Sequence, residues 1–306
     1  MVTNNKRYIR FTWLVLIFVF LVIIAGAIVR TTQSGMGCPD WPTCFGRWIP
    51  PVNEKQLPPD FEKYLRKQDI DHTFNALHTW IEWINRMTTG VLGILIIAHI
   101  VWSFKLFFNT ANRKICWLSL SLMLIVGVEA WLGKVVVDTN LDVAKISAHM
   151  LLAVFLSAIC ITILHILNKR KPVENKGLKI FTTVVLLLVL TQIVIGTDVR
   201  EQVDHISKAL KYLHREQWLG SVNSFIVVHE SFAWLVGFTC LFLFWKGLTY
   251  PALQKTGFLI LITVLLEIAV GLVLGNFSMP AILQPVHLLL AAILVVAVFN
   301  FRLKLK

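Results

Sequence analysis

The stretch WIEWINRMTTGVLGILIIAHIVWSFK, residues 80–105, decides the fold of this chain. Its first turns carry Glu82, Asn85 and Arg86, and from Val91 onward it is almost wholly apolar. An apolar run of this length is typical of a helix that crosses a bilayer, because the hydrocarbon core needs about 20 apolar residues. Ionisable side chains in such a helix are costly, so they indicate a functional site.

The composition places the whole chain in the membrane class. Of its 306 residues, 57% are hydrophobic and only 15% are charged, far from the balance of a soluble domain. We expect an all-α polytopic protein with little room for a soluble domain. Eight transmembrane helices are expected, at roughly residues 11–30, 79–104, 115–137, 143–167, 178–198, 219–245, 256–275 and 281–301. The first segment is expected to be retained, because its apolar part is long and no small-residue cleavage site follows it.

The distribution of charge predicts the orientation. If the N-terminus is cytoplasmic, the inner segments carry many Lys and Arg residues and a single acid, Glu174. This asymmetry favours a protein of the cell inner (plasma) membrane with both termini in the cytoplasm. We attribute the net charge of +12 to this topology and to contact with anionic membrane lipid. Nucleic-acid binding is not expected, since no soluble basic domain is present.

The chain contains an internal repeat, divided by the basic loop at residues 169–179. Each half has an even number of helices, so the repeats run parallel. We expect two parallel-repeat four-helix bundles, in residues 1–170 and 171–306. Residues 26–30 align with 196–200 at an offset of 170, and residues 85–93 align with 229–237 at an offset of 144. The last two helices of each half align at an offset of 138, where Glu129 matches Glu267 and His149 matches His287.

Three intramembrane histidines mark the candidate site. His149, His229 and His287 lie in the outer parts of otherwise apolar segments. The last two are on helices two apart in their bundle, which favours opposed imidazoles that hold a haem iron. A single buried histidine is more often a hydrogen-bonded packing residue, as we expect for His99 and His165, but the symmetric set favours ligands. Zinc is a weaker alternative, because no Cys or carboxylate accompanies the histidines at tetrahedral spacing.

The two halves are unequal. The first half offers His149 but has Asn85 where the repeat predicts a second ligand, and Asn85 shares one helical stripe with His78 and Glu82. The residue that corresponds to Glu82 in the second half is Ile226. The second bundle is therefore expected to hold an electron-carrying or structural haem. The first is expected to be a reaction chamber, in which Glu82 accepts a proton or stabilises a developing cation.

Further polar residues are repeat-related. Arg30 and Arg200 end corresponding helices at the outer surface, where each could hold a haem propionate or simply extend to the membrane interface. Arg86 is a third propionate candidate. Glu129 and Glu267 lie deeper, and an interhelical hydrogen bond is favoured for them over catalysis.

The outer loop TTQSGMGCPDWPTCFGRWIPP, residues 31–51, carries Cys38 and Cys44 at a separation of six. The spacing allows a structural staple or a thiol pair that exchanges with a redox partner. Within this loop, SGMGCPDWPTCFG resembles the first outer loop of the haem A synthase family. The likeness covers nearly the whole chain, through IEWINRM, KISAHMLLA, FIVVHES and LQPVHLLLA.

The resemblance implies an enzyme that oxidises the C8 methyl group of haem O to a formyl group, which makes haem A for terminal oxidases. It implies haem b on His229 and His287, the substrate haem on His149, and Glu82 as the catalytic glutamate. Haem O synthase and terminal oxidase assembly are the implied partners, and electrons must pass through a separate, unidentified carrier. A homo-oligomer stays open.

The resemblance also covers the loop cysteines, with one departure nearby. It implies that Cys38 and Cys44 form a disulfide or take part in haem or electron transfer. The family commonly has Glu-x-x-His where this chain has Asn85 in place of the His. We therefore expect His149 as the sole strong substrate ligand, with Asn85 donating a hydrogen bond to a water or oxygen ligand. His78 could bind only if the haem lies closer to the surface.

Other functions were weighed against this one. The main alternative is a di-haem electron-transfer protein or a haem carrier that performs no chemistry on the macrocycle. A secondary transporter is disfavoured because no proline interrupts a helix core. Prenyl transfer to haem is disfavoured because the chain has no Asp-rich motif for magnesium pyrophosphate.

Overall fold

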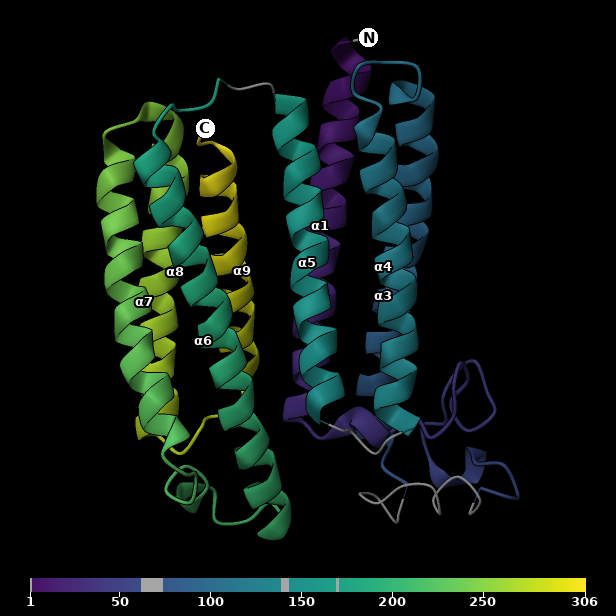
Figure 1. Ribbon diagram of the computed structural model, residues 1–306. Helices are drawn as coiled ribbons and strands as arrows, with labels where there is room; N and C mark the ends of the chain where they lie inside the picture. Colours follow the sequence, from purple (N-terminus) through teal and green to yellow (C-terminus); the bar gives the residue numbers. More distant parts are fainter. Residues whose placement is uncertain (1, 62–73, 139–142, 169–170) are drawn as a thin grey trace. The chain divides into compact units, whose positions relative to one another are not determined.

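The structure is a computed structural model that describes residues 2–61, 74–138, 143–168 and 171–306. Within these ranges the chain is helical apart from loops and two isolated β-bridges. Among the described residues, eight helices are long and apolar enough to cross a membrane, which confirms the predicted multi-pass architecture (Figure 1). They are α1 (Val2–Thr31), α3 (Ala76–Phe107), α4 (Lys114–Asp138), α5 (Val143–Asn168), α6 (Lys176–Ala209), α7 (Phe225–Leu248), α8 (Pro251–Asn276) and α9 (Leu283–Leu303). The loops that the structure describes contain the short 3-10 helices η1 (Ser34–Met36), η2 (Glu54–Gln56) and η3 (Arg215–Gln217).

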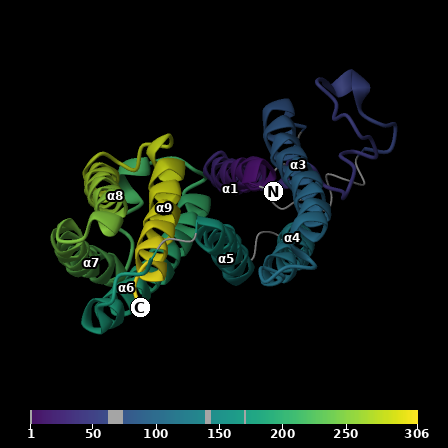
Figure 2. The same cartoon turned by 90° about the horizontal axis from the view of Figure 1, so that it is seen from above.

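The chain forms two compact units, Met1–Ile163 and Leu164–Lys306. In the second unit, α6 and α8 each pack against both α7 and α9, so the four helices surround a shared interior (Figure 2). In this arrangement α7 and α9 lie diagonally across the bundle. In the first unit, α3 packs between α1 and α4. The predicted boundary at residue 170 falls outside the described residues, and the parallel repeat stays a prediction.

One helix is longer than its sequence predicts. The segment expected to end at residue 198 continues as α6 to Ala209. Val199 and Val203 are both buried, and their spacing of four residues places them on one face of the extension. Val203 packs in a small cluster with Trp218, so the added turns are amphipathic and not part of the apolar run. The next helix, α7, accordingly begins at Phe225, later than expected.

A buried polar network fixes α1 against α3 and α4. The hydroxyl of Tyr8 lies 3.2 Å from Nδ1 of His99 and 3.3 Å from the hydroxyl of Ser119. Nε2 of His99 lies 3.0 Å from the hydroxyl of Thr12. All four residues are fully buried. Both nitrogens of His99 are therefore used within the protein, which agrees with its interpretation as a packing residue.

The variant Tyr8→Phe is expected to destabilise the first unit, because it leaves Nδ1 of His99 without its hydroxyl partner inside the helix bundle. Hydrogen bonds between membrane helices contribute about 0.6 kcal/mol on average and about 1.7 kcal/mol at most, so a loss in this range is expected. Equilibrium unfolding in mixed micelles, followed by circular dichroism, measures it. Trp13→Phe is the control, since Trp13 is 46% exposed on the same helix. Equal destabilisation by both variants would contradict the assignment.

Candidate functional site

His229 on α7 is held against α6. Nε2 of Gln192 lies 3.1 Å from Nδ1 of His229 and donates to the backbone oxygen of His229 at 3.0 Å. One turn along α6, a Cβ atom at Gly196 would lie only 2.9 Å from Cε1 of the imidazole. A side chain at position 196 would therefore displace the ring, so the glycine is required for this close approach.

His287 on α9 is held against α8 in a similar way. Its Nδ1 lies 3.2 Å from Oε1 of Glu267, and Gly271, one turn along α8, leaves ordinary van der Waals space for the ring. The other carboxylate oxygen, Oε2, is buried and has no hydrogen-bond partner among the described residues. The imidazole is therefore the main partner of this carboxylate.

The two histidines of the second unit face a common interior. They lie on α7 and α9, the diagonal helices of the bundle. Each directs Nδ1 toward a neighbouring helix, which leaves Nε2 for another partner. Two imidazoles on diagonal helices are a donor set that fits a haem iron. An imidazole that binds iron through Nε2 carries its proton on Nδ1, so at His229 the amide of Gln192, whose nitrogen lies against Nδ1 here, would have to turn its oxygen toward the ring.

The first unit contains one comparable histidine. Nδ1 of His149 on α5 pairs with Oε2 of Glu129 on α4, while Oε1 of Glu129 is buried without a hydrogen-bond partner in the part of the chain that the structure describes. Asn85 on α3 lies beside Gly26 of α1, since a Cβ there would be 4.0 Å from Oδ1 of Asn85. That amide oxygen is also buried and makes no hydrogen bond to a described residue.

These contacts recur at the positions that the repeat alignment pairs. The Glu129–His149 pair corresponds to Glu267–His287, and the Gly26–Asn85 neighbours correspond to Gly196–His229. The parallel repeat itself stays a prediction. One contact has no counterpart: the position that corresponds to Gln192 is Val22, which cannot form a side-chain hydrogen bond.

Sequence reasoning missed Gln192 as a site residue. The available signal was its polarity, because it is the one amide in the apolar segment TTVVLLLVLTQIVIG, residues 182–196. Nothing in the sequence showed that this amide turns toward α7.

Glu82, the predicted catalytic carboxylate, lies beneath the outer loop. Its side chain is 4% exposed. Oε2 accepts a hydrogen bond from the backbone N–H of Cys38 at 2.6 Å, and Oε1 accepts one from Nη2 of Arg86. Both oxygens therefore have protein partners, and the loop fixes the position of the carboxylate.

Arg86 joins α3 to the same loop. Besides Glu82, its guanidinium donates to the backbone oxygens of Cys38 at 2.9 Å, Asp40 at 2.6 Å and Thr43 at 3.0 Å. A propionate could bind here only if some of these contacts were released. The described contacts favour a loop-anchoring role for Arg86, and its propionate role stays a prediction.

The outer loop is closed by a disulfide between Cys38 and Cys44. Asp40 lies inside the closed loop and accepts backbone N–H groups at 2.5 and 2.9 Å. Gly37 brings the loop onto the beginning of α3, because a Cβ there would lie 2.5 Å from the carbonyl carbon and oxygen of His78. His78 thus contributes its backbone to the loop contact.

Arg30 lies in the last turn of α1, whereas Arg200 lies inside α6, which continues to Ala209. The prediction that Arg200 ends its helix is therefore wrong. Arg200 on α6 pairs with Asp204 at 2.8 Å and donates to the side-chain oxygen of Gln284 on α9, one turn before His287. It therefore joins α6 to the first turn of α9. Arg30 is partly buried in the last turn of α1. The propionate role of both residues stays a prediction.

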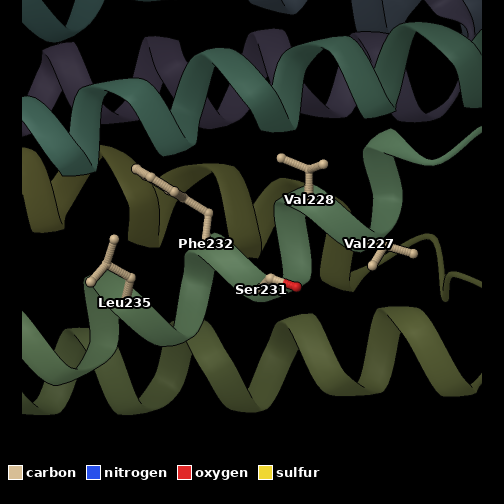
Figure 3. A pocket seen from close by; sticks show the side chains of 5 residues that line it. All are labelled: Val227, Val228, Ser231, Phe232 and Leu235. Carbon is tan, nitrogen blue, oxygen red and sulfur yellow. The ribbon is translucent and has the colours of Figure 1, made fainter.

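An apolar hollow of about 340 Å³ lies on α7 (Figure 3). It is lined by Val227, Val228, Ser231, Phe232 and Leu235. No ionisable side chain lines this hollow, and none of the predicted site residues does. It therefore adds no reactive group to the candidate site.

Comparison with known proteins supports the resemblance seen in the motifs. The sequence model of the cytochrome oxidase assembly protein family matches residues 9–299. The chain is 32% identical over 143 residues to the heme A synthase of Shewanella oneidensis, which covers 46% of this chain and 40% of that protein. For the heme A synthase of Pelagibacter ubique the identity is 26% over 220 residues, 64% of this chain and 62% of that protein. The chain spans about half the length of the curated relatives it matches.

The variant Gly37→Ala is expected to separate the outer loop from α3, because its Cβ would meet backbone atoms that cannot move aside. The Cys38–Cys44 disulfide would then be more accessible to a bulky reductant. Alkylation with a polyethylene-glycol maleimide during exposure to reductant measures the rate of opening, which should exceed that of the unmodified chain. Gly93→Ala is the matched control, since a Cβ there meets nothing within 4 Å. Opening rates that match in both variants would show that the loop does not depend on this contact.

Proposed function

Because the chain belongs to the cytochrome oxidase assembly protein family, we propose that it acts as a haem A synthase, which oxidises the C8 methyl group of haem O to the formyl group of haem A. The observation that carries this proposal is that the two units differ in their candidate haem ligands. One presents two imidazoles across a shared interior, and the other presents one imidazole with an amide at the equivalent second position.

The second unit is proposed to hold haem b between His229 and His287. Each ring has a polar side chain beside Nδ1 and a glycine on the neighbouring helix, so both would hold the iron through Nε2. Arg200, near the beginning of α9, would hold a propionate. A haem with two histidine ligands supplies electron transfer, since neither face is open to a reactant.

The first unit is proposed to bind the substrate, haem O. His149 would bind its iron from α5, Asn85 would present its amide from α3, and His78 would lie further out on the same helix. Glu82 would accept a proton released as the methyl group is oxidised. Its bonds to Cys38 and Arg86 would keep the carboxylate at a fixed position during that transfer.

The cellular setting follows from the same proposal. The chain would lie in the cell plasma membrane with both termini in the cytoplasm, because the inner loops are the basic ones. It would receive haem O from haem O synthase, release haem A to terminal oxidase assembly, and exchange electrons with a separate carrier.

A second function is a di-haem electron-transfer or haem-carrier protein. It would require equivalent ligation of both haems and no chemical change in either. Asn85 at the position of His229 weighs against equivalent ligation.

Co-expression with a haem O source tests the two functions. The proposed enzyme should yield a formyl-bearing haem, identified by mass and by a pyridine haemochrome spectrum, whereas a carrier should return haem O unchanged. His229→Ala and His287→Ala should each lose haem b from the purified chain. His214→Ala, at a histidine that is 61% exposed, should retain it. A colourless chain, or full pigmentation after loss of both imidazoles, would refute the proposal.

Asn85→Ala should lower turnover more than it lowers haem b retention, because Asn85 lies in the first unit and has no contact with the histidine pair of the second. Turnover is measured as haem A formed per haem b bound. Equal loss of turnover and haem b would indicate general destabilisation and contradict a specific role for Asn85.

A further inference from the structure

The three candidate ligand histidines share one feature of their surroundings. In each, Nδ1 faces a polar side chain of a neighbouring helix: Gln192 for His229, Glu267 for His287 and Glu129 for His149. No hydrogen bond to Nε2 of these three occurs among the described residues. Nδ1 is therefore the ring nitrogen that lies beside a polar side chain in all three, and Nε2 is the one left to bind iron.

Glu129 and Glu267 make no other hydrogen bond that would explain a buried carboxylate among the described residues. Glu129 is 5% exposed, and each carboxylate keeps one buried oxygen without a hydrogen-bond partner in the described ranges. A carboxylate inside membrane helices is costly, and a packing role would be served equally well by an amide or an apolar residue. A carboxylate that accepts N–H from a ligand imidazole fixes the orientation of the ring and raises its basicity.

The side-chain amide of Gln192 occurs only in the unit that has a histidine at the paired position. In the second unit Gln192 accompanies His229. In the first unit, the corresponding positions hold Val22 and Asn85. The unit that lacks the imidazole thus also lacks the amide, whereas both units retain the Glu–His pair. This pattern connects Gln192 to ring positioning and not to general packing of α6.

We propose that Glu267 and Gln192 are positioning residues that orient His287 and His229 toward haem b, and that Glu129 does the same for His149 toward the substrate haem. This inference rests on the proposed function for the identity of the haems. The two ligands of haem b would be unequal, because His287 has an anionic partner and His229 a neutral one. Through Glu267, the imidazole of His287 would donate more strongly and stabilise ferric iron.

The first test separates charge from orientation at Glu267. Glu267→Gln keeps an acceptor but removes the charge, so the haem should be retained while its midpoint potential rises. Glu267→Leu removes the acceptor as well. Loss of such a partner typically weakens metal binding by roughly 10- to 100-fold, and haem retention should fall accordingly. Spectroelectrochemical titration and pyridine haemochrome content are the two measurements.

Gln192→Leu should reproduce the loss of haem retention with a smaller change in midpoint potential, since no charge is removed. Glu230→Gln is the matched control, because it removes a carboxylate from α7 that has no hydrogen bond to either imidazole in the described structure. It should retain haem as the unmodified chain does. Size-exclusion chromatography in detergent establishes that each variant is folded, and Glu267→Gln keeps the test decisive if the leucine variants fail to fold.

In the first unit, Glu129→Gln should raise KM for haem O more than it lowers kcat, while the haem b content is unchanged. A uniform loss of haem b and activity would mark Glu129 as structural and overturn its part of the proposal.

The outcomes distinguish this inference from the proposed function. An unchanged midpoint potential in Glu267→Gln, together with normal haem retention in Glu267→Leu and Gln192→Leu, would overturn the positioning roles even if the chain makes haem A. A shifted potential and lost haem in these variants would support the roles even if no formyl haem is formed, in which case only the proposed function would fail.

Discussion

The arrangement of this protein depends on how ionisable side chains are satisfied inside apolar helices. A carboxylate or a basic group at the centre of a membrane helix costs about 2.5–3.5 kcal/mol on insertion scales, and the cost falls when a partner lies on the neighbouring helix. Glu129 with His149, and Glu267 with His287, are such partners. Each pair joins two consecutive helices, so it also fixes which face of each helix turns toward the other. The most chemically useful residues are thus also those that set helix rotation.

Under the proposed function, the same constraint would allow the two units to take different roles. Replacing an imidazole by Asn85 leaves a neutral group that tolerates burial, and the partner amide is then dispensable, as Val22 shows. Besides its Glu129–His149 pair, the first unit carries Glu82 and Arg86 further out, where both form hydrogen bonds with the backbone of the outer loop. The second unit has Ile226 at the position of Glu82 and needs no such loop.

The sequence alone predicted those structural elements that depend on neighbouring residues in the chain. An apolar run of about 20 residues specifies a membrane helix without knowledge of its neighbours, so all eight spans were found. The end of α6 was misjudged because its last turns are amphipathic, and their burial depends on Trp218 from a later segment. The histidines were found because they are rare in apolar segments. Gln192 was missed because its role depends on the rotation of α6 toward α7, which a single sequence does not reveal.

The contact between Glu82 and Cys38 shows the limit of reasoning from helical stripes. The stripe correctly places Glu82 one turn from Asn85, but the loop that covers Glu82 lies 44 residues earlier in the chain. Because the N–H of Cys38 donates a hydrogen bond to the carboxylate, the position of Glu82 depends on the closed conformation of the loop. A substitution of Cys38 or Cys44 would therefore alter the surroundings of Glu82 as well as remove a thiol. A loss of activity in such a variant could come from the missing thiol or from the displaced Glu82. Thiol chemistry can therefore be inferred only where the hydrogen bonds of Glu82 are shown to be intact.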